Sequence, residues 1–346
     1  MTGLEVFFDN LAVQIALKSI VVLTVTAVGG IVYGYIELKM MAHMQARLGP
    51  MDAGGFHGWA QLVAIGVSFF QKEDLIPDRA DRPIYKMSPL IVLTSMILLY
   101  VVIPIGPTLS VATLDIGVFF ALAVAGISTI GLLLAGWSSG NKYSLMGALR
   151  ASGQAIAYEL PLVLSVVGAV IQASTTSMQG LVIAQAEPMF HLGELAIRLP
   201  YGISTQVVGF AIYVVSIMAE LNRAPFDMPV AESELVTGPY TEYSGFRFLF
   251  FFLAEYATLV AFAAIGTAVF LGGWYVPGIP LDSDAFIWLG PLIFVAKTSL
   301  IVLFLFWVRI TWPRLKEDQL QALCWKVLIP LALVNVAVTG IFKVLL

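Results

Sequence analysis

The 346 residues are 59% hydrophobic and only 12% charged, whereas a soluble domain carries about 25% charged residues, so the composition excludes a soluble protein and indicates an integral membrane protein. The formal net charge of -4 argues against a nucleic-acid partner. The single cysteine, Cys324, excludes a disulfide framework and any cysteine-ligated iron–sulfur cluster within this chain.

Eight apolar runs meet or approach the length that crosses a bilayer as a helix, about 20 residues. They are residues 12–36, 88–107, 115–137, 155–174, 201–221, 247–273, 286–307 and 325–345. Backbone groups in lipid must be satisfied within the segment, and continuous runs of this length achieve that as helices. The sequence therefore predicts an all-α membrane fold, a bundle of about eight transmembrane helices in a single domain spanning residues 1–346.

The first connection, residues 37–87, is too long to be a bare turn. Within it, residues 56–70 are mostly apolar but too few to span a bilayer. This pattern predicts an amphipathic helix that lies in the membrane interface.

The positive charges of the connections predict the orientation of the chain. The odd-numbered connections hold many lysines and arginines, namely Lys39, Arg47, Lys72, Arg79, Arg82, Lys86, Lys142, Arg150, Arg223, Arg247, Arg309, Arg314 and Lys316. The even-numbered connections hold only Arg198. Because positive charge marks the cytoplasmic side, we expect a multi-pass protein of the cell inner membrane with both termini outside.

An acidic loop follows the fifth run, in the stretch 218–245. Its acids are Glu220, Asp227, Glu232, Glu234 and Glu242, and Arg223 is the one basic residue within the loop. Prolines and large apolar residues interleave with these acids, which is unusual for a loop that is only solvated. We expect the loop to be docked against protein, with its acids titrating as a coupled set.

Further ionisable residues lie at membrane depth, where charge is expensive and usually functional. They are Glu37, Glu159, Glu255 and Lys297. Taken one at a time, the acids near the ends of the apolar runs are also consistent with ordinary carboxylates at the membrane interface. Glu255 and Lys297 are likewise consistent with a purely structural ion pair. Together with Glu220 they favour a proton relay, because burial raises the pKa of a carboxyl toward neutrality. In that interpretation Lys297 tunes the pKa of a neighbouring glutamate.

The sequence carries no nucleophile–base pair, phosphate-binding glycine loop or cluster with metal-ligand spacing. The chain is therefore not expected to be catalytic alone or to bind a metal. If it takes part in redox chemistry, its electrons come from a partner.

Four motifs, spread from Glu37 to Lys326, carry a family resemblance. The first is E-L-K-x-x-x-x-x-Q-x-R-x-G-P, starting at Glu37, and the second is N-K-Y-S-x-x-G-x-x-R-x-x-x-Q-x-x-x-Y-E, ending at Glu159. The third is A-E-x-N-R-x-P-F-D-x-P around Glu220, continued by A-E-Y at Glu255. The fourth joins Lys297 to R-x-x-x-P-R-x-x-x-D-Q-L and Trp325-Lys326. In this order the motifs resemble one membrane subunit, designated H, of bacterial proton-pumping NADH:quinone oxidoreductase (respiratory complex I), the counterpart of mitochondrial subunit 1.

The resemblance implies a subunit at the junction of the peripheral and membrane arms, holding the entrance and much of the chamber of a quinone substrate. The residues that would line or adjoin that chamber are Glu37, Arg47, Glu220, Arg223, Asp227, Glu232, Glu234 and Glu242. Glu159, Glu220 and Glu255 would begin the proton path into the membrane arm. The partners would be the other subunits of the complex and membrane lipid. Partner subunits would carry NADH, flavin and the iron–sulfur clusters, including the terminal cluster, and no cofactor would be bound covalently here.

Four positions depart from the family pattern by losing a charge. Leu38 stands where arginine is usual, Ile65 and Ser68 where aspartate and lysine are common, and Val230 where glutamate usually continues the third motif. These losses keep open a related membrane anchor of an energy-converting hydrogenase or another donor-specific complex. A secondary cation or proton transporter acting alone is disfavoured by the large docked loops and by the lack of paired broken helices.

Overall fold

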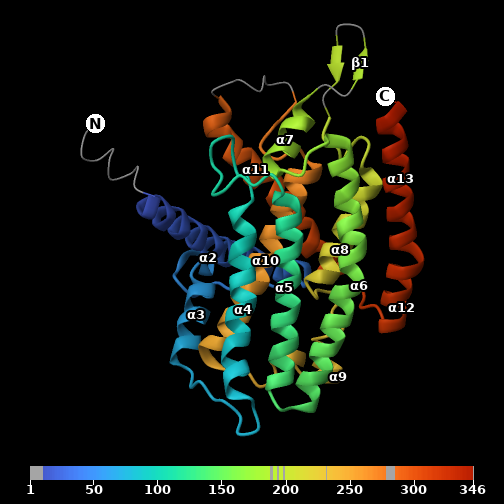
Figure 1. Ribbon diagram of the computed structural model, residues 1–346. Coiled ribbons are helices and arrows are strands. Elements are labelled where there is room, and N and C mark those ends of the chain that lie inside the picture. Colours follow the sequence, from blue (N-terminus) through green and yellow to red (C-terminus); the bar gives the residue numbers. More distant parts are fainter. Residues whose placement is uncertain are drawn as a thin grey trace.

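The computed structural model describes residues 11–187, 190–192, 195–197, 199–230, 232–277 and 285–345. Within these ranges, seven helical segments are long and apolar enough to cross a membrane. They are α2 (Leu11–Met44), α4 (Arg82–Val101), α5 (Gly117–Ser138), α6 (Lys142–Ala173), α10 (Gly245–Phe270), α11 (Ala285–Thr311) and the continuous segment of α12 (Glu317–Leu323), η3 (Cys324–Leu328) and α13 (Ile329–Leu345). The predicted membrane-embedded helical bundle is confirmed (Figure 1).

The remaining elements are short. They are η1 (Phe56–Gly58), α3 (Gln61–Gln71), α7 (Met178–Ala186), β1 (Phe190–Leu192), β2 (Leu195–Ile197), α8 (Val207–Glu220), α9 (Glu232–Leu235) and η2 (Gly238–Tyr240). The strands β1 and β2 form a small antiparallel hairpin at one end of the bundle (Figure 1), which the apolar pattern did not predict.

The fifth predicted run is the one whose helix is clearly shorter than expected. The run covers residues 201–221, but α8 begins at Val207. The preceding residues turn across the end of α10 instead, where the Gly202 amide donates to the Phe270 carbonyl at 2.7 Å. The Gln206 amide then closes that turn on the carbonyl of Tyr201 at 2.7 Å. Apolar composition alone did not reveal this use of the run as a cap on a neighbouring helix.

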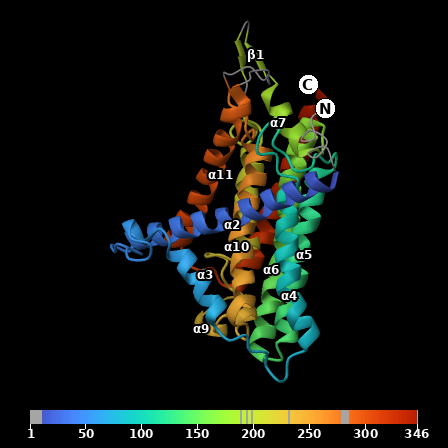
Figure 2. The same cartoon turned by 90° about the vertical axis from the view of Figure 1, so that its left-hand side faces the viewer.

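The helix α2 crosses the bundle obliquely, whereas α4, α5, α6 and α10 run side by side (Figure 2). Its 34 residues extend about 51 Å at 1.5 Å per residue, so the helix exceeds the roughly 30 Å of bilayer hydrocarbon and tilt accommodates it. The tilt opens a wedge beside α10, and α3 packs into it against both α2 and α10. The helix predicted over residues 56–70 is thus present, although its α-helical part begins only at Gln61.

The centre of the bundle is α10, which packs against α2, α3, α4, α7, α8 and α11. Close helix crossings depend on glycine, as is general for membrane helices. A Cβ at Gly136 in α5 would lie 2.3 Å from the Cβ of Ala148 in α6, so only glycine permits this approach.

Candidate functional site

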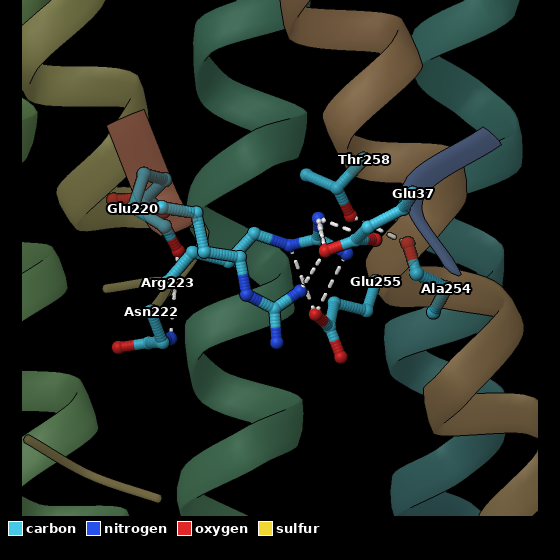
Figure 3. Close-up of polar contacts among 8 residues, drawn as sticks. Glu37, Glu220, Asn222, Arg223, Ala254, Glu255 and Thr258 are labelled. Carbon is cyan, nitrogen blue, oxygen red and sulfur yellow. Dashed lines mark hydrogen bonds and ion pairs between the residues drawn. The ribbon is translucent and has the colours of Figure 1, made fainter. Parts of the chain in front are cut away.

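Arg223, in the loop after α8, is the centre of a buried ion cluster. Its side chain is 5% exposed. Nη1 donates to both carboxylate oxygens of Glu37 at 3.2 and 3.1 Å, and Nη2 lies 2.9 Å from the Oε1 of Glu255. Glu37 comes from α2 and Glu255 from α10, so one arginine joins two helices and the loop (Figure 3). The family resemblance in the sequence implies Glu37 and Arg223 at the chamber and Glu255 on the proton path, and the structure brings all three side chains into contact.

Arg309, near the end of α11, completes the cluster by also donating to Glu37. Two guanidinium groups therefore face two carboxylates, and the local formal charge cancels. Burial lowers the pKa of Arg223, but Glu255 and Glu37 raise it by more, so its net pKa is raised and the group stays charged. Buried charges are stable only with such paired and hydrogen-bonded geometry.

Aromatic rings lie close to the Arg223 guanidinium. Its Cζ lies 4.7 Å from the ring centroid of Tyr256 and 5.6 Å from that of Phe306. Cation–π attraction adds to the ion pairs and is strongest where water is excluded. The guanidinium is therefore held both by carboxylates and by rings.

Glu220 ends α8 next to this cluster, on the opposite side of Arg223 from Glu255 in Figure 3. Among the described residues its buried Oε2 has no hydrogen-bond partner. Glu159 of α6 is the other acid of this region, and a Cβ at Gly126 in α5 would lie 3.2 Å from its Oε1. Gly126 therefore makes the room that the Glu159 carboxylate occupies.

Lys297 does not pair with Glu255, so the structural Glu–Lys pair considered from the sequence is wrong. Its Nζ donates to three backbone carbonyls just beyond α10, those of Leu271, Gly273 and Tyr275, at 2.6, 3.0 and 2.6 Å. The reason is distance along the helix, because Glu255 precedes Leu271 by 16 residues, or about 24 Å. Lys297 instead binds the chain segment that follows α10, and its positive charge lies at the negative end of the α10 dipole.

The acidic loop is docked, as predicted, through partners outside it. Asp227 binds Arg314 at 2.9 Å, Glu234 binds Arg150 at 2.6 Å, and Glu242 accepts from Asn141 at 2.5 Å. The side chain of Glu232 lies outside the part of the chain that the structure describes.

Asp227, Glu234 and Glu242 each have their own basic or amide partner, and the expectation that the loop acids titrate as a coupled set stays a prediction. Burial raises the pKa of Asp227, Arg314 lowers it by less, and Glu255 adds a smaller increase. The coupling that the structure supports thus runs from the loop to the Arg223 cluster.

Arg47 is the predicted site residue that lies apart from the cluster. It is exposed, and its Nε donates to the side chain of nearby Gln45 at 2.8 Å. The turn after α2 carries it outward, away from Glu37.

Two site residues were missed by sequence reasoning. In the sequence, Arg309 was identified only as part of the fourth motif and as a cytoplasmic positive charge. Arg223 is shared between two glutamates, so the buried carboxylate of Glu37 takes a second cationic partner, Arg309. Gln154 of α6 is 3% exposed, and its Nε2 donates to the carbonyls of Ala219 and Phe226 at 2.7 and 2.8 Å. Its place as the glutamine of the second motif was the available signal, because a buried amide must find partners.

An apolar cavity of about 370 Å³ lies in the wedge between α2, α3 and α10. It is lined by Gly30 and Ile31 of α2, by Val63, Gly66 and Phe70 of α3, and by Phe252 and Tyr256 of α10, with five further apolar residues. The ring of Tyr256 thus borders both the cavity and Arg223. Ligand sites are typically concave and apolar with a few polar groups at one place.

The described residues contain no cluster of three or more histidine, cysteine, aspartate or glutamate side chains that could hold a metal. What they contain is an apolar cavity that meets a buried, charge-balanced cluster, with the unpaired carboxylate oxygen of Glu220 nearby. This arrangement suits binding of an apolar molecule and movement of protons near it.

Comparison with known proteins now adds the family. A family model described as NADH dehydrogenase matches residues 17–340. The chain belongs to this family. It is 41% identical over 337 residues to the NADH-quinone oxidoreductase subunit designated H of Anoxybacillus flavithermus, a match covering 97% of this chain and 96% of that protein. The proteins of the same name from Bacillus cytotoxicus and Bacillus cereus are 42% and 40% identical, covering 93% of this chain and 92% of each relative. The resemblance drawn from the motifs is confirmed.

The positions that depart from the family pattern do not line the cavity. Leu38 and Ile65 are half-buried, and Ser68 is exposed, with its hydroxyl donating to the Ile65 carbonyl at 2.7 Å. Val230 lies half-buried in the acidic loop. The Arg223 cluster keeps its charged members despite these losses.

Proposed function

We propose that this chain is the membrane subunit that forms the quinone chamber of a proton-pumping NADH:quinone oxidoreductase and couples quinone reduction to proton translocation. Relatives that match over nearly their whole length carry the name of one subunit of an NADH-quinone oxidoreductase. As a subunit it supplies the chamber and the proton groups. NADH, flavin and iron–sulfur clusters, including the terminal cluster that reduces the quinone, belong to partner subunits.

One observation carries this proposal, namely that the apolar cavity is lined in part by Tyr256, whose ring contacts Arg223 of the ion cluster. A quinone combines a long apolar chain with a head group that gains negative charge when reduced. The cavity offers an apolar wall to the chain, and the cluster lies where the polar end would continue. The geometry therefore favours a lipid-soluble redox substrate over a free ion or a water-soluble metabolite.

The proton step follows from electrostatics. Reduction of quinone adds negative charge to a poorly hydrated chamber and draws protons toward it. Arg223 is held by Glu37 and Glu255 and responds to that charge, because added negative charge competes with these carboxylates for the guanidinium. Glu220 and Glu159 then carry the change inward toward the membrane arm.

The acidic loop contributes the cytoplasmic half of this mechanism. Asp227, Glu234 and Glu242, with Glu232, adjoin the chamber and exchange protons with it when the cluster changes. The contacts of the first three with Arg314, Arg150 and Asn141 support this, since they tie the loop to three other parts of the bundle. Arg47, which lies away from the cluster, fits a place at the outer entrance of the chamber.

The location follows from the same assignment. The chain lies in the cell inner membrane with both termini outside, and the loop side faces the cytoplasm. There it contacts the peripheral-arm subunits that hold the quinone head group and the terminal iron–sulfur cluster. Its apolar outer helices face other membrane subunits and lipid.

The test is to fill the cavity without disturbing the fold. Gly66 lines the cavity, and a Cβ added there would meet no atom within 4 Å. Gly66→Phe in the assembled complex should raise the KM for quinone at least tenfold, because its ring occupies the space of the substrate chain. Activity is measured in membrane vesicles with NADH and quinones of differing chain length.

Gly29→Phe is the matched control, because a Cβ at Gly29 in α2 also meets nothing and Gly29 does not line the cavity. It should leave the KM unchanged. Electron transfer from NADH to a water-soluble acceptor that bypasses the quinone should be normal in both variants and reports intact assembly. An unchanged quinone KM in an assembled Gly66→Phe complex would rule out this cavity as the quinone path.

A further inference from the structure

Tyr256 is the residue that belongs to both halves of the proposed site. Its side chain lines the apolar cavity between α2, α3 and α10. The residue is only 7% exposed, and its ring centroid lies 4.7 Å from the Cζ of Arg223. Tyr256 therefore borders both the cavity and the charged cluster.

The packing of α2 leaves room for this ring through two glycines on one face of the helix. A Cβ at Gly34 would lie 2.5 Å from the Leu62 side chain and 3.4 Å from the Cε1 of Tyr256, and one at Gly30 would lie 3.7 Å from the Cβ of Tyr256. Gly30 also lines the cavity. Tyr256 thus packs against α2 where glycines leave space, beside the Leu62 and Leu253 side chains that also line the cavity.

The guanidinium of Arg223, which the Tyr256 ring contacts, has little freedom to move. Arg223 also has the ring of Phe306 at 5.6 Å and carboxylates of Glu37 and Glu255 bound to its nitrogens. Side chains packed this closely move by discrete rearrangement, so displacement of one ring shifts its neighbour. A shift of Arg223 changes its hydrogen bonds to both glutamates together, because the same guanidinium serves both.

We propose that Tyr256 is a positioning residue that transmits occupancy of the cavity to Arg223. A prenyl chain or quinoid ring pressed against Tyr256 fixes its ring, and the ring in turn sets the place of the guanidinium between Glu37 and Glu255. The inference rests on the proposed function, because it takes a quinone as the molecule in the cavity. It adds that the aromatic ring, rather than the hydroxyl, does the positioning.

The experiment separates the ring from the cavity wall. In the assembled complex, Tyr256→Leu keeps an apolar wall but removes the ring from Arg223. It should lower kcat for quinone reduction about tenfold while the KM for quinone stays within about twofold of wild type. Tyr256→Phe keeps the ring and should restore at least half of the wild-type kcat.

Phe70→Leu is the matched control, because Phe70 of α3 lines the same cavity, whereas the rings over Arg223 are those of Tyr256 and Phe306. Phe70→Leu should raise the KM and spare kcat. The same response in Phe70→Leu and Tyr256→Leu would overturn the proposal, as would a Tyr256→Phe variant as impaired as Tyr256→Leu.

Reduction of a water-soluble acceptor verifies assembly of each variant. The quinone KM of Gly66→Phe distinguishes a failure of the Tyr256 proposal alone from a failure of the proposed quinone cavity. If that variant has a raised quinone KM and Tyr256→Leu retains full kcat, the quinone cavity stands and the positioning role of Tyr256 is refuted. If Gly66→Phe behaves as wild type, the cavity assignment itself fails, and the proposal for Tyr256 fails with it.

Discussion

Arg223 and Arg314 are both arginines that bind carboxylates, yet their surroundings differ sharply. The Arg223 side chain is 5% exposed and contacts two glutamates, whereas that of Arg314 is 37% exposed and contacts one aspartate. Removing one member of a buried pair leaves an uncompensated charge in low dielectric, whereas water replaces a partner lost at the surface. The same substitution should therefore have unequal consequences.

Arg223→Met should destabilise the folded chain by about 3–5 kcal/mol, because Glu255 loses its guanidinium partner and Glu37 retains only Arg309. Arg314→Met should cost about 0–1 kcal/mol. Thermal unfolding of the two variants in the same detergent makes the comparison. Equal losses would mean that the Arg223 cluster is as well solvated as the surface pair.

Asp227 is expected to lower stability at neutral pH. Its net pKa is raised, since burial outweighs the guanidinium of Arg314. A carboxyl with a raised native pKa stabilises the fold fully below its unfolded pKa of about 3.9, and this contribution is lost as pH rises through the native pKa. Asp227→Asn should therefore raise stability at pH 7, by no more than about 1 kcal/mol, and make no difference near pH 4.

Thermal unfolding of wild type and Asp227→Asn between pH 4 and pH 7 tests this sign. A variant less stable than wild type at pH 7 would show that the contact with Arg314 outweighs burial. In the assembled complex, Asp227→Asn should reduce quinone more slowly than wild type. That result would indicate that Asp227 serves the proton chemistry although it lowers the stability of the fold.

At the scale of the helix, Lys297 is a cap on α10 and thereby helps to fix the helix that carries Glu255 and Tyr256. Lys297→Met should leave three carbonyls without their donor, and a buried unsatisfied polar group costs about 1–3 kcal/mol. Amide hydrogen exchange at residues 265–275 should accelerate as the end of α10 loosens. Quinone turnover should fall only in proportion to that loosening.

Lys343 offers the control, because its Nζ also donates to a carbonyl near a helix C-terminus, that of Gln172 at 3.0 Å, but from an exposed position. Lys343→Met should cost less than about 1 kcal/mol. Loss of proton pumping in Lys297→Met with unchanged hydrogen exchange would support a relay role for Lys297 instead of a cap.

The helices were predictable from the sequence because run length in lipid leaves few alternatives, and seven of the eight apolar runs fall largely on long helices, whereas the fifth run begins with a turn. The docked loop was predictable for a similar reason, since Phe226 and the loop prolines do not suit a solvated turn. The pairing of individual acidic and basic side chains was not predictable from the sequence. The pairing of Glu37 with Arg309 depends on the tilt of α2 and the rotation of α11, and these are set by packing between distant segments.

At the scale of the whole molecule, the loop ion pairs Arg150–Glu234, Arg247–Asp74 and Arg314–Asp227 lie at one end. The Asp81 amide donates to the Ser138 carbonyl at 2.9 Å, so the connection before α4 adjoins the connection after α5. The Leu315 amide donates to the Pro225 carbonyl at 3.0 Å, so the connection after α8 adjoins the connection after α11. The β1–β2 hairpin and the end of α13 lie at the opposite end (Figure 1). Such polarity fits a peripheral arm docked on one face and an open opposite face.

Cysteine labelling tests the orientation of this polarity in the cell membrane. The only native cysteine, Cys324, is buried, so a new cysteine reports against a low background. Leu345→Cys should react with a membrane-impermeant maleimide in intact cells, because Leu345 is exposed at the end proposed to lie outside. Lys142→Cys, exposed beside the acidic loop, should react only after the membrane is opened. The reverse pattern would invert the chain and place the acidic loop on the side away from the cytoplasm, which would contradict the proposed docking of an NADH-oxidising arm there.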